Sequence, residues 1–215
     1  NLIYYENKNE YINKNKISYL EYGDLSNLDK MTNILDHIDY VVVLAGLVGD
    51  PITKKYESLS KIINEDNIIN FVNRFAFKNF KKFIFISTCS NYGLINEDQI
   101  ADENFELKPL SLYSKSKVKI ENYLINNNFN FQPTILRFAT AFGLSERMRF
   151  DLTVNEFTAD LFLKKSIDVY DQDTWRPYCH VKDFARLIYM IIESDISKVG
   201  NQVFNAGSNI NNASK

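Results

Sequence analysis

Tyr113 and Lys117, in the segment Tyr-Ser-Lys-Ser-Lys, have the types and the spacing for acid/base chemistry. A separation of four residues on a helix places both side chains on one face, about 40° apart. A phenol is a poor base at neutral pH because its pKa is near 10, and a neighbouring ammonium stabilises the phenolate. The pair could therefore act as a general acid/base, although the same spacing also occurs on solvated helix faces.

A second group of candidates, Ser87-Thr88-Cys89-Ser90, directly follows the apolar run Phe83-Ile84-Phe85-Ile86. A short apolar run of this kind predicts a strand that is buried on both faces. A hydroxyl at the end of that strand could donate to a substrate oxygen beside Tyr113. The alternative is that these hydroxyls only cap a turn.

The elements that must position these candidates alternate along the chain. Strands are predicted at residues 16–22, 40–45, 82–87, 134–138 and 202–205, and helices at about 28–35, 56–77, 110–124, 152–163 and 181–193. Strands separated by helices favour βαβ units and a parallel sheet. In such sheets ligands bind beyond the carboxyl ends of the strands, and Ser87 to Ser90 follow such an end.

The composition excludes several classes of function. Among 215 residues, 25 Lys and Arg face 27 Asp and Glu, so a concentrated positive face for nucleic acid is not expected. The apolar runs are too short to span a membrane. Two cysteines cannot form a disulfide framework, and there is no Cys/His cluster with metal spacing. We expect a cytoplasmic protein without a metal, a nucleic-acid partner or a membrane segment.

The two ends of the sequence predict that it is the middle of a longer protein. Asn1 to Tyr5 has no initiator Met and none of the features of a signal peptide. Residues 205–215 form a polar stretch in which no closing helix or strand is expected.

Several motifs together resemble the extended short-chain dehydrogenase/reductase family, in particular its NAD-dependent nucleotide-sugar epimerases and dehydratases. They cover nearly the whole chain in the family's order: Gly23-Asp24-Leu25, Leu44-Ala45-Gly46, Asn64, Ser87 to Gly93, Tyr113 with Lys117, Arg137 to Gly143, and Arg176 to Asp183. Several spaced motifs in one order are far more specific than any one of them.

The resemblance implies an α/β fold with a Rossmann-type, doubly wound parallel sheet. Its first βα unit, with the glycine-rich loop that binds the pyrophosphate, would precede Asn1. Residues 1–143 and 172–206 would form a truncated dinucleotide-binding domain. Residues 144–171 and 207–215 would form part of a small, incomplete substrate-binding region.

The resemblance also implies the cofactor NAD. NADP is possible, because the residue that selects between the two would also precede Asn1. Asp24 would meet the adenine, and Leu44-Ala45-Gly46 would form the turn under the cofactor. The implied cofactor-binding residues are Asp24, Leu25, Leu44, Ala45, Gly46, Asn64, Ser87, Tyr113 and Lys117.

The implied catalytic residues are Thr88, Tyr113 and Lys117. In the family's epimerases, the counterpart of Tyr113 takes the proton from the sugar 4-hydroxyl while NAD takes the C4 hydride. Lys117 would bind the nicotinamide ribose and lower the pKa of the phenol. Thr88 would hydrogen-bond the same sugar oxygen. The implied reaction is epimerisation of a nucleotide-diphosphate sugar, at C4, through a transient 4-keto intermediate.

The family's 4,6-dehydratases carry an Asp-Glu pair directly after the catalytic Thr, and its nucleotide-sugar decarboxylases carry a Glu at the second position after it. This chain has Cys89 and Ser90 at these two positions. Dehydration and decarboxylation are therefore disfavoured. Thr88, Thr140, Asn155 and Arg176 are the implied substrate-binding residues, and an Arg fork suits the diphosphate. His180 is expected to support its loop rather than to act as a catalyst.

The resemblance further implies a homodimer, formed through the helix after Pro51 and the helix that bears Tyr113. Two alternatives remain open for the function. One is an NADP-dependent nucleotide keto-sugar reductase, which an Arg just before Asn1 would favour. The other is a non-catalytic, nucleotide-binding relative, against which the set Thr88, Tyr113 and Lys117 argues.

Overall fold

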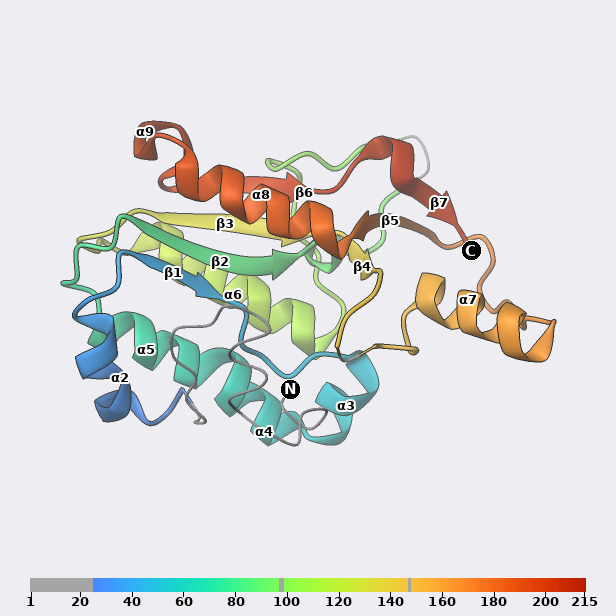
Figure 1. The fold of residues 1–215 in the computed structure, drawn as a ribbon, viewed down its shortest axis with the longest axis horizontal. Helices are drawn as coiled ribbons and strands as arrows, with labels where there is room; N and C mark the ends of the chain where they lie inside the picture. Colours follow the sequence, from blue (N-terminus) through green and yellow to red (C-terminus); the bar gives the residue numbers. More distant parts are fainter. Residues whose placement is uncertain (1–24, 97–98, 147) are drawn as a thin grey trace.

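The structure is a computed structural model, and it describes residues 25–96, 99–146 and 148–215. Strands and helices alternate over these ranges, as the sequence predicts (Figure 1). The strand predicted at residues 16–22 and the residue Asp24 lie outside the described residues.

The main sheet has four strands, all parallel, in the order β1-β2-β3-β6. Thr88 is level with Phe138 on the next strand, and Phe138 is level with Ala206, so the carboxyl ends of these strands share one edge. The strands are β1 Tyr40–Val43, β2 Lys82–Thr88, β3 Pro133–Phe138 and β6 Gln202–Ala206.

Helices cover both faces of this sheet, which confirms the doubly wound α/β fold (Figure 1). Parallel neighbours require a crossover connection, and the helices between the strands provide it. One face is covered mainly by α2 Leu28–Leu35, α5 Asn67–Arg74 and α6 Leu112–Asn126. The other face is covered by α8 Val181–Glu193 and the short α9 Ile196–Val199.

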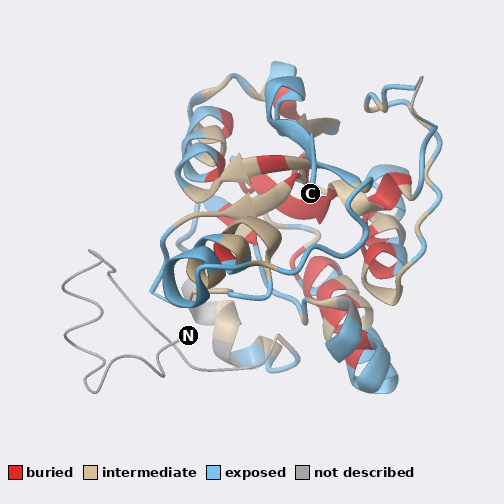
Figure 2. Ribbon diagram, turned by 90° about the vertical axis from the view of Figure 1, so that its right-hand side faces the viewer, coloured by how far each residue is buried: buried red, intermediate tan, exposed pale blue. Residues whose placement is uncertain are grey.

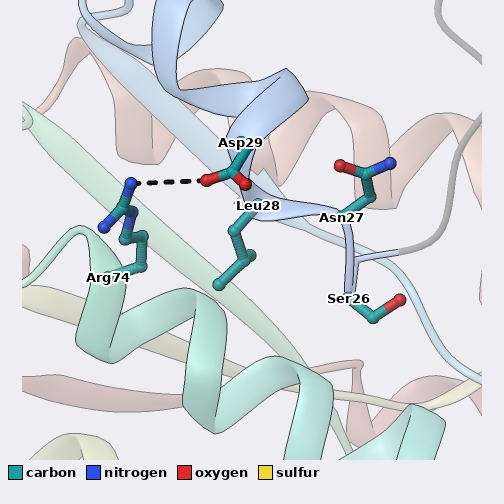
Figure 3. Close-up of a pocket in the computed structure, with 5 residues that line it drawn as sticks. All are labelled: Ser26, Asn27, Leu28, Asp29 and Arg74. Atoms are coloured by element: carbon teal, nitrogen blue, oxygen red, sulfur yellow. Dashed lines mark hydrogen bonds and ion pairs between the residues drawn. The ribbon is translucent and has the colours of Figure 1, made fainter.

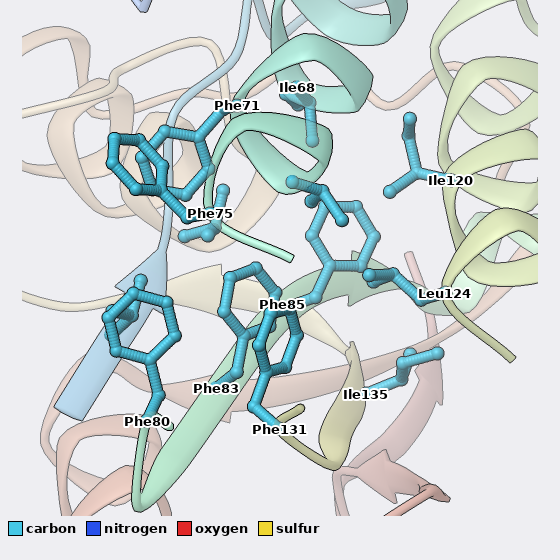
Figure 4. Packing of buried hydrophobic residues seen from close by; sticks show 13 residues of the cluster. Ile68, Phe71, Phe75, Phe80, Phe83, Phe85, Ile120, Leu124, Phe131 and Ile135 are labelled. Carbon is cyan, nitrogen blue, oxygen red and sulfur yellow. The ribbon is translucent and has the colours of Figure 1, made fainter. Parts of the chain in front are cut away.

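Strand β2 supplies the core on both faces, because successive side chains of a strand point in opposite directions. Phe83 and Phe85 pack on the α5 and α6 side, where a cluster of aromatic rings gathers (Figure 4). Ile84 and Ile86 pack on the other side, under α8. Buried residues accordingly concentrate on the sheet and on the inward faces of the helices (Figure 2).

The single helix predicted at residues 56–77 is wrong in its bounds and in its continuity. Helical structure begins earlier, with α3 Asp50–Lys55, and breaks at Tyr56, whose φ of −121° and ψ of 56° are not helical. After α4 Glu57–Lys61 comes a π-helical segment, η2 Ile62–Asp66, and α5 then ends at Arg74. Segments of π-helix are frequent at functional sites, and this one carries Asn64.

A second, small sheet has three strands in the order β4-β5-β7. They are β4 Thr140–Phe142, β5 Trp175–His180 and β7 Asn212–Ser214. The expectation that residues 205–215 hold no strand is therefore wrong. Asn and Ser have little strand propensity, so β7 depends on its pairing with β5, which the local sequence does not reveal.

The helix α7, Thr153–Lys164, matches the prediction for residues 152–163 and projects from the rest of the molecule in Figure 1. It follows β4 along the chain and precedes β5. The division into dinucleotide-binding and substrate-binding ranges stays a prediction.

Candidate active site

The first two turns of α6 carry Tyr113 and Lys117. The helix begins there because Ser111 and Ser114 form a reciprocal cap: the Oγ of each accepts from the backbone N–H of the other, at 3.2 Å. These bonds satisfy N–H groups that have no partner within the helix. The cap therefore fixes the residue at which the helix starts, and with it the face on which the pair lies.

Lys117 is buried, and its Nζ donates to the backbone oxygen of Ile86 on β2, at 2.7 Å. The same Nζ lies 4.5 Å from the ring centre of Phe85 and 5.7 Å from that of Tyr113. Burial lowers the pKa of Lys117 from its usual 10.5 to about 8, against the opposing effect of the Glu121 carboxylate. The ammonium therefore lies between the phenol ring and the end of β2.

Thr88 is the last residue of β2 and is buried. Its Oγ1 accepts from the N–H of Ser90 at 3.2 Å and caps the 3-10 helix η3, Cys89–Tyr92. The hydroxyl is thus a cap, which was the alternative interpretation, but as an acceptor in this bond it retains its own proton for donation. Thr88 lies two residues beyond Ile86, so the threonine and the ammonium of Lys117 approach the same strand end.

The loop after β1 presents Leu44, Ala45 and Gly46 as exposed residues. Asn64 is buried beneath it: its Oδ1 accepts from the N–H of Leu47 at 2.7 Å, and its Nδ2 donates to the Leu47 oxygen at 2.9 Å. A Cβ at Gly46 would lie only 3.1 Å from Asn64 Oδ1, so a larger residue would require the Asn64 side chain or the loop to shift by a few tenths of an ångström. An exposed backbone loop held from below suits a dinucleotide cofactor at the sheet edge.

The remaining predicted cofactor residues are less informative. Leu25 is half-buried and packs against the core between the sheet and α5, and Asp24 is outside the described residues. Ser87 is buried, and its Oγ accepts from Asn91 Nδ2 at 3.0 Å.

The predicted substrate residues come from the small sheet and α7. Thr140 is half-buried on β4, and Arg176 is exposed on β5. Burial raises the pKa of the Cys89 thiol, and the Arg176 guanidinium opposes that rise, so Arg176 is near the residue that follows Thr88. The structure thus brings β5 and the end of β2 together.

Asn155, at the start of α7, uses its side-chain amide to hold a loop. Its Oδ1 accepts from the N–H of Gly143 and its Nδ2 donates to the Arg149 oxygen, both at 3.1 Å. Arg149 itself pairs with Asp151, and Tyr113 is among the groups that raise the pKa of the guanidinium, so this loop approaches the phenol of Tyr113.

His180 holds the start of the helix that follows it. Its Nδ1 accepts from the N–H of Lys182 at 3.2 Å and caps α8. Its ring lies edge-on to Phe142, with 5.3 Å between ring centres. Gly143 has a φ of 121°, and a Cβ there would approach His180 Nε2 to 2.5 Å, so only glycine fits this turn.

Sequence reasoning missed a buried ion pair behind this site, in which the carboxylate of Glu121 binds the guanidinium of Arg137 at 2.8 Å. A signal for it is present in the sequence, because Tyr113, Lys117 and Glu121 recur at intervals of four along one helix.

A surface pocket of about 460 Å³ lies elsewhere, between the start of α2 and the end of α5 (Figure 3). Its ion pair, Arg74 with Asp29 at 3.5 Å, is exposed, and none of the predicted site residues lines it. Among the described residues, no group of His, Cys, Asp or Glu could hold a metal ion. Nor does that part of the chain include a helix long and apolar enough to cross a bilayer.

Residues 3–207 match the model of the NAD dependent epimerase/dehydratase family. The chain belongs to this family. Among curated proteins it is similar to UDP-glucuronate 4-epimerase 6 of Arabidopsis thaliana, with 25% identity over 189 residues, which is 83% of this chain and 40% of that protein. It is also similar to an uncharacterized protein of Methanocaldococcus jannaschii, MJ1055, with 27% identity over 145 residues, which is 66% of this chain and 42% of that protein.

Solved structures share its fold. A UDP-N-acetylglucosamine 4-epimerase from Methanobrevibacter ruminantium superposes with a TM-score of 0.75 at 26% identity, over 86% of this chain and 59% of that one. A UDP-glucuronic acid 4-epimerase from Bacillus cereus, in complex with UDP-glucuronic acid and NAD, gives 0.80 at 23%, over 94% and 64%. This epimerase family member thus spans less than two thirds of those relatives' length.

Proposed function

We propose that the protein is an NAD-dependent nucleotide-sugar epimerase that acts at C4 of the sugar. The observation that carries this proposal is the buried Lys117 ammonium. It lies between the Tyr113 ring and the backbone oxygen of Ile86, which is two residues before Thr88, the last residue of β2. Three groups for proton transfer and charge stabilisation thus belong to one strand end and the helix packed on it. The 4-epimerases among the similar structures support the choice of reaction.

In this proposal Tyr113 removes the proton from the sugar 4-hydroxyl and returns it after the configuration at C4 has changed. Lys117 favours the phenolate through its charge, and the Thr88 hydroxyl donates a hydrogen bond to the same sugar oxygen and stabilises the charge that develops there. NAD, when bound, supplies the acceptor and donor of the C4 hydride. The loop of Leu44 to Gly46, held by Asn64, would bind the cofactor together with Lys117, and Asp24, Leu25 and Ser87 remain predicted contacts.

The position after Thr88 argues against the family's dehydratases. Burial raises the pKa of Cys89, so its thiol stays protonated at neutral pH and is a poor base. Ser90 donates its backbone N–H to Thr88, and a serine hydroxyl is too weak an acid or base for elimination.

The substrate in this proposal is a nucleotide-diphosphate sugar. Arg176 would bind the diphosphate, because its guanidinium is exposed and near the residue that follows Thr88. Thr140 would contact the sugar. Asn155 is proposed to act at the diphosphate, in addition to holding the loop of Gly143 and Arg149.

We also propose a homodimer through the helical segments after Pro51 and α6. Large apolar side chains are exposed on these segments, namely Ile52, Tyr56, Leu59, Ile62 and Ile125. A helix-on-helix interface would remove them from water. Sedimentation at micromolar concentration should give a dimer, and a monomer would refute this part of the proposal.

The decisive experiment offers the natural, full-length protein a panel of UDP-sugars and other nucleotide sugars with NAD, and follows the configuration at C4 of the product. Tyr113→Phe should lower kcat by about 10²–10⁴-fold without loss of folding. Tyr123→Phe is the matched control, because Tyr123 lies on the same helix and its hydroxyl donates to Asn73 instead. Full activity of Tyr113→Phe would refute the proposed proton transfer, and net oxidation of NADPH with a keto sugar would indicate a reductase.

A further inference from the structure

A buried polar network lies directly behind the proposed catalytic residues. Its centre is the carboxylate of Glu121, whose side chain is 2% exposed, paired with Arg137, whose side chain is 6% exposed. Arg137 Nε and a terminal nitrogen both donate to Glu121 Oε2, at 3.1 and 2.8 Å. Asn91 Nδ2 donates to Glu121 Oε1 at 2.7 Å.

The network joins the elements that carry the chemistry. Glu121 is on α6, eight residues after Tyr113 and four after Lys117. Asn91 is on η3, three residues after Thr88, and its Nδ2 also donates to Ser87 Oγ at 3.0 Å. One amide thus connects the helix of the acid/base pair to the strand end that carries Thr88.

Arg137 extends the network to two further segments. Its other terminal nitrogen donates to the hydroxyl of Tyr92 at 2.8 Å and to the backbone oxygen of Glu103 at 3.1 Å. The Tyr92 hydroxyl in turn donates to Asn205 Oδ1 on β6 at 2.6 Å. The guanidinium therefore donates to the Glu121 carboxylate, the Tyr92 hydroxyl and the Glu103 backbone. The turn η3 is held by two of its residues, since Asn91 binds Glu121 and Tyr92 binds Arg137.

A buried ion pair of this kind is weak evidence for stability. The desolvation of both charges offsets much of their attraction, and apolar residues of similar size often serve the fold as well. Its place between β2, η3 and α6 suggests a role in the site instead. We infer that Glu121 and Arg137 are positioning residues, which hold the strand end of Thr88 and the helix of Tyr113 and Lys117 in one arrangement. This inference rests on the proposed function.

The same carboxylate has an electrostatic effect on Lys117. Besides Lys117 itself, its own helix and the neighbouring η2, η3 and β3 carry the titratable groups Glu65, Asp66, Cys89, Tyr92, Tyr113, Lys115, Lys119, Glu121, Tyr123 and Arg137. Glu65 is engaged by Lys119 and Ser116, whereas Glu121 raises the pKa of Lys117 against the larger, opposite effect of burial. Without Glu121, Lys117 would lose its proton at a lower pH and would favour the phenolate less.

The test measures the titration of Lys117 directly, by NMR of lysine labelled at Cε and Nζ in the full-length protein, with Lys117→Met to assign the signal. This readout does not depend on activity. In Glu121→Gln the midpoint should fall by about one pH unit or more. The alkaline limb of the pH profile of kcat should shift to lower pH together with this midpoint. At pH 7, kcat should fall at least about tenfold, and KM for the nucleotide sugar should change less than about threefold.

Asn91→Ala tests the positioning of Thr88 separately from the effect of the Glu121 charge on Lys117. The variant removes the link from Glu121 to Ser87 and leaves the Glu121 carboxylate in place. It should lower kcat about tenfold while the Lys117 midpoint stays within a few tenths of a unit. If Glu121→Gln does not fold, the double variant Glu121→Met with Arg137→Met removes both charges and decides the question. Recovered folding with kcat still low supports the inference.

Parental kcat and an unchanged alkaline limb in that double variant would overturn the inference, because the pair would then serve the fold alone. An unchanged Lys117 midpoint in Glu121→Gln would overturn it as well. Failure of the proposed function is distinguishable, since the parent protein would then show no epimerisation whatever the titration of Lys117.

Discussion

The edge of the main sheet and the small sheet β4-β5-β7 hold their side chains in different ways. At the main edge, Lys117 and Asn64 are buried and each is hydrogen-bonded to the backbone of another segment. On the small sheet, Arg176 and Trp175 are exposed on β5, and α7, which joins β4 to β5, exposes much of its apolar surface.

This difference separates the proposed reaction from the proposed recognition. Groups that move protons need a geometry fixed to a fraction of an ångström, which a packed scaffold with backbone hydrogen bonds provides. Groups that bind different substrates are better placed on exposed segments, where a substitution costs little stability. We therefore expect substitutions at the main edge to change stability and turnover, and substitutions on the small sheet and α7 to change binding alone.

The largest effect is expected for Phe83→Ala on β2. Phe83 is fully buried and stacks on Phe131, with 4.5 Å between ring centres, so its removal leaves a cavity under α5 and α6. The free energy of unfolding should fall by about 3–5 kcal/mol. Urea denaturation measures this, and a loss below about 1 kcal/mol would contradict the packing of the main sheet.

The same contrast explains what the sequence could predict. The buried strands of the main sheet read as short apolar runs, such as Phe83 to Ile86, and their positions were predicted nearly to the residue. The strand β7 was not predicted, because Asn212 to Ser214 has no apolar pattern and pairs with a strand more than thirty residues away in the sequence.

At the site, the order of motifs predicted Tyr113, Lys117 and Thr88 through a family resemblance. The structure adds how they are held, and that part depends on contacts over long sequence distances. The interval of four from Lys117 places Glu121 on the same face of the helix, but it does not predict that Glu121 binds Asn91 and Arg137, which belong to other elements. The break at Tyr56 and the π-helical turn were also missed, because residues 56–66 contain no proline or glycine that would mark an interruption of the helix.

The second prediction concerns Lys117→Met, which should stabilise the protein and abolish most of its turnover. The pKa of Lys117 is lowered from 10.5 to about 8, so the charged form is disfavoured in the folded state. That cost is fully present below pH 8, shrinks as the pH rises toward 10.5, and is absent above it. At pH 7 the variant should gain about 1–3 kcal/mol, after the loss of the bond to the Ile86 oxygen.

Thermal unfolding at pH 7 and at pH 10 measures this effect, and the gain should be smaller at pH 10. Lys119→Met is the matched control, because Lys119 is two residues away on the same helix and pairs with Glu65 at the surface. The control should change stability by less than about 1 kcal/mol at either pH. A Lys117→Met variant that is less stable than the parent at pH 7 would show that burial of the charged Lys117 does not lower the free energy of unfolding.

The third prediction tests recognition at the small sheet. Arg176→Gln should raise KM for the nucleotide sugar about tenfold, because a charge-assisted bond to the diphosphate is lost. Since Arg176 is exposed, the free energy of unfolding should change by less than about 0.5 kcal/mol. Arg186→Gln, at an exposed position of α8, is the control for a general change in charge. A drop in kcat at unchanged KM would instead place Arg176 among the groups that act on the reacting atoms.

The smallest effect is expected for Phe162→Ser on α7. Phe162 is 74% exposed, whereas Phe83 is 1% exposed, so the two substitutions remove the same type of side chain from opposite environments. An exposed ring loses little apolar contact when it is removed, and the free energy of unfolding should change by less than about 0.5 kcal/mol. The measurement is made on the full-length protein beside Phe83→Ala. A loss above about 2 kcal/mol would mean that this ring is covered in the folded protein, and α7 would then belong with the buried scaffold rather than with the exposed segments.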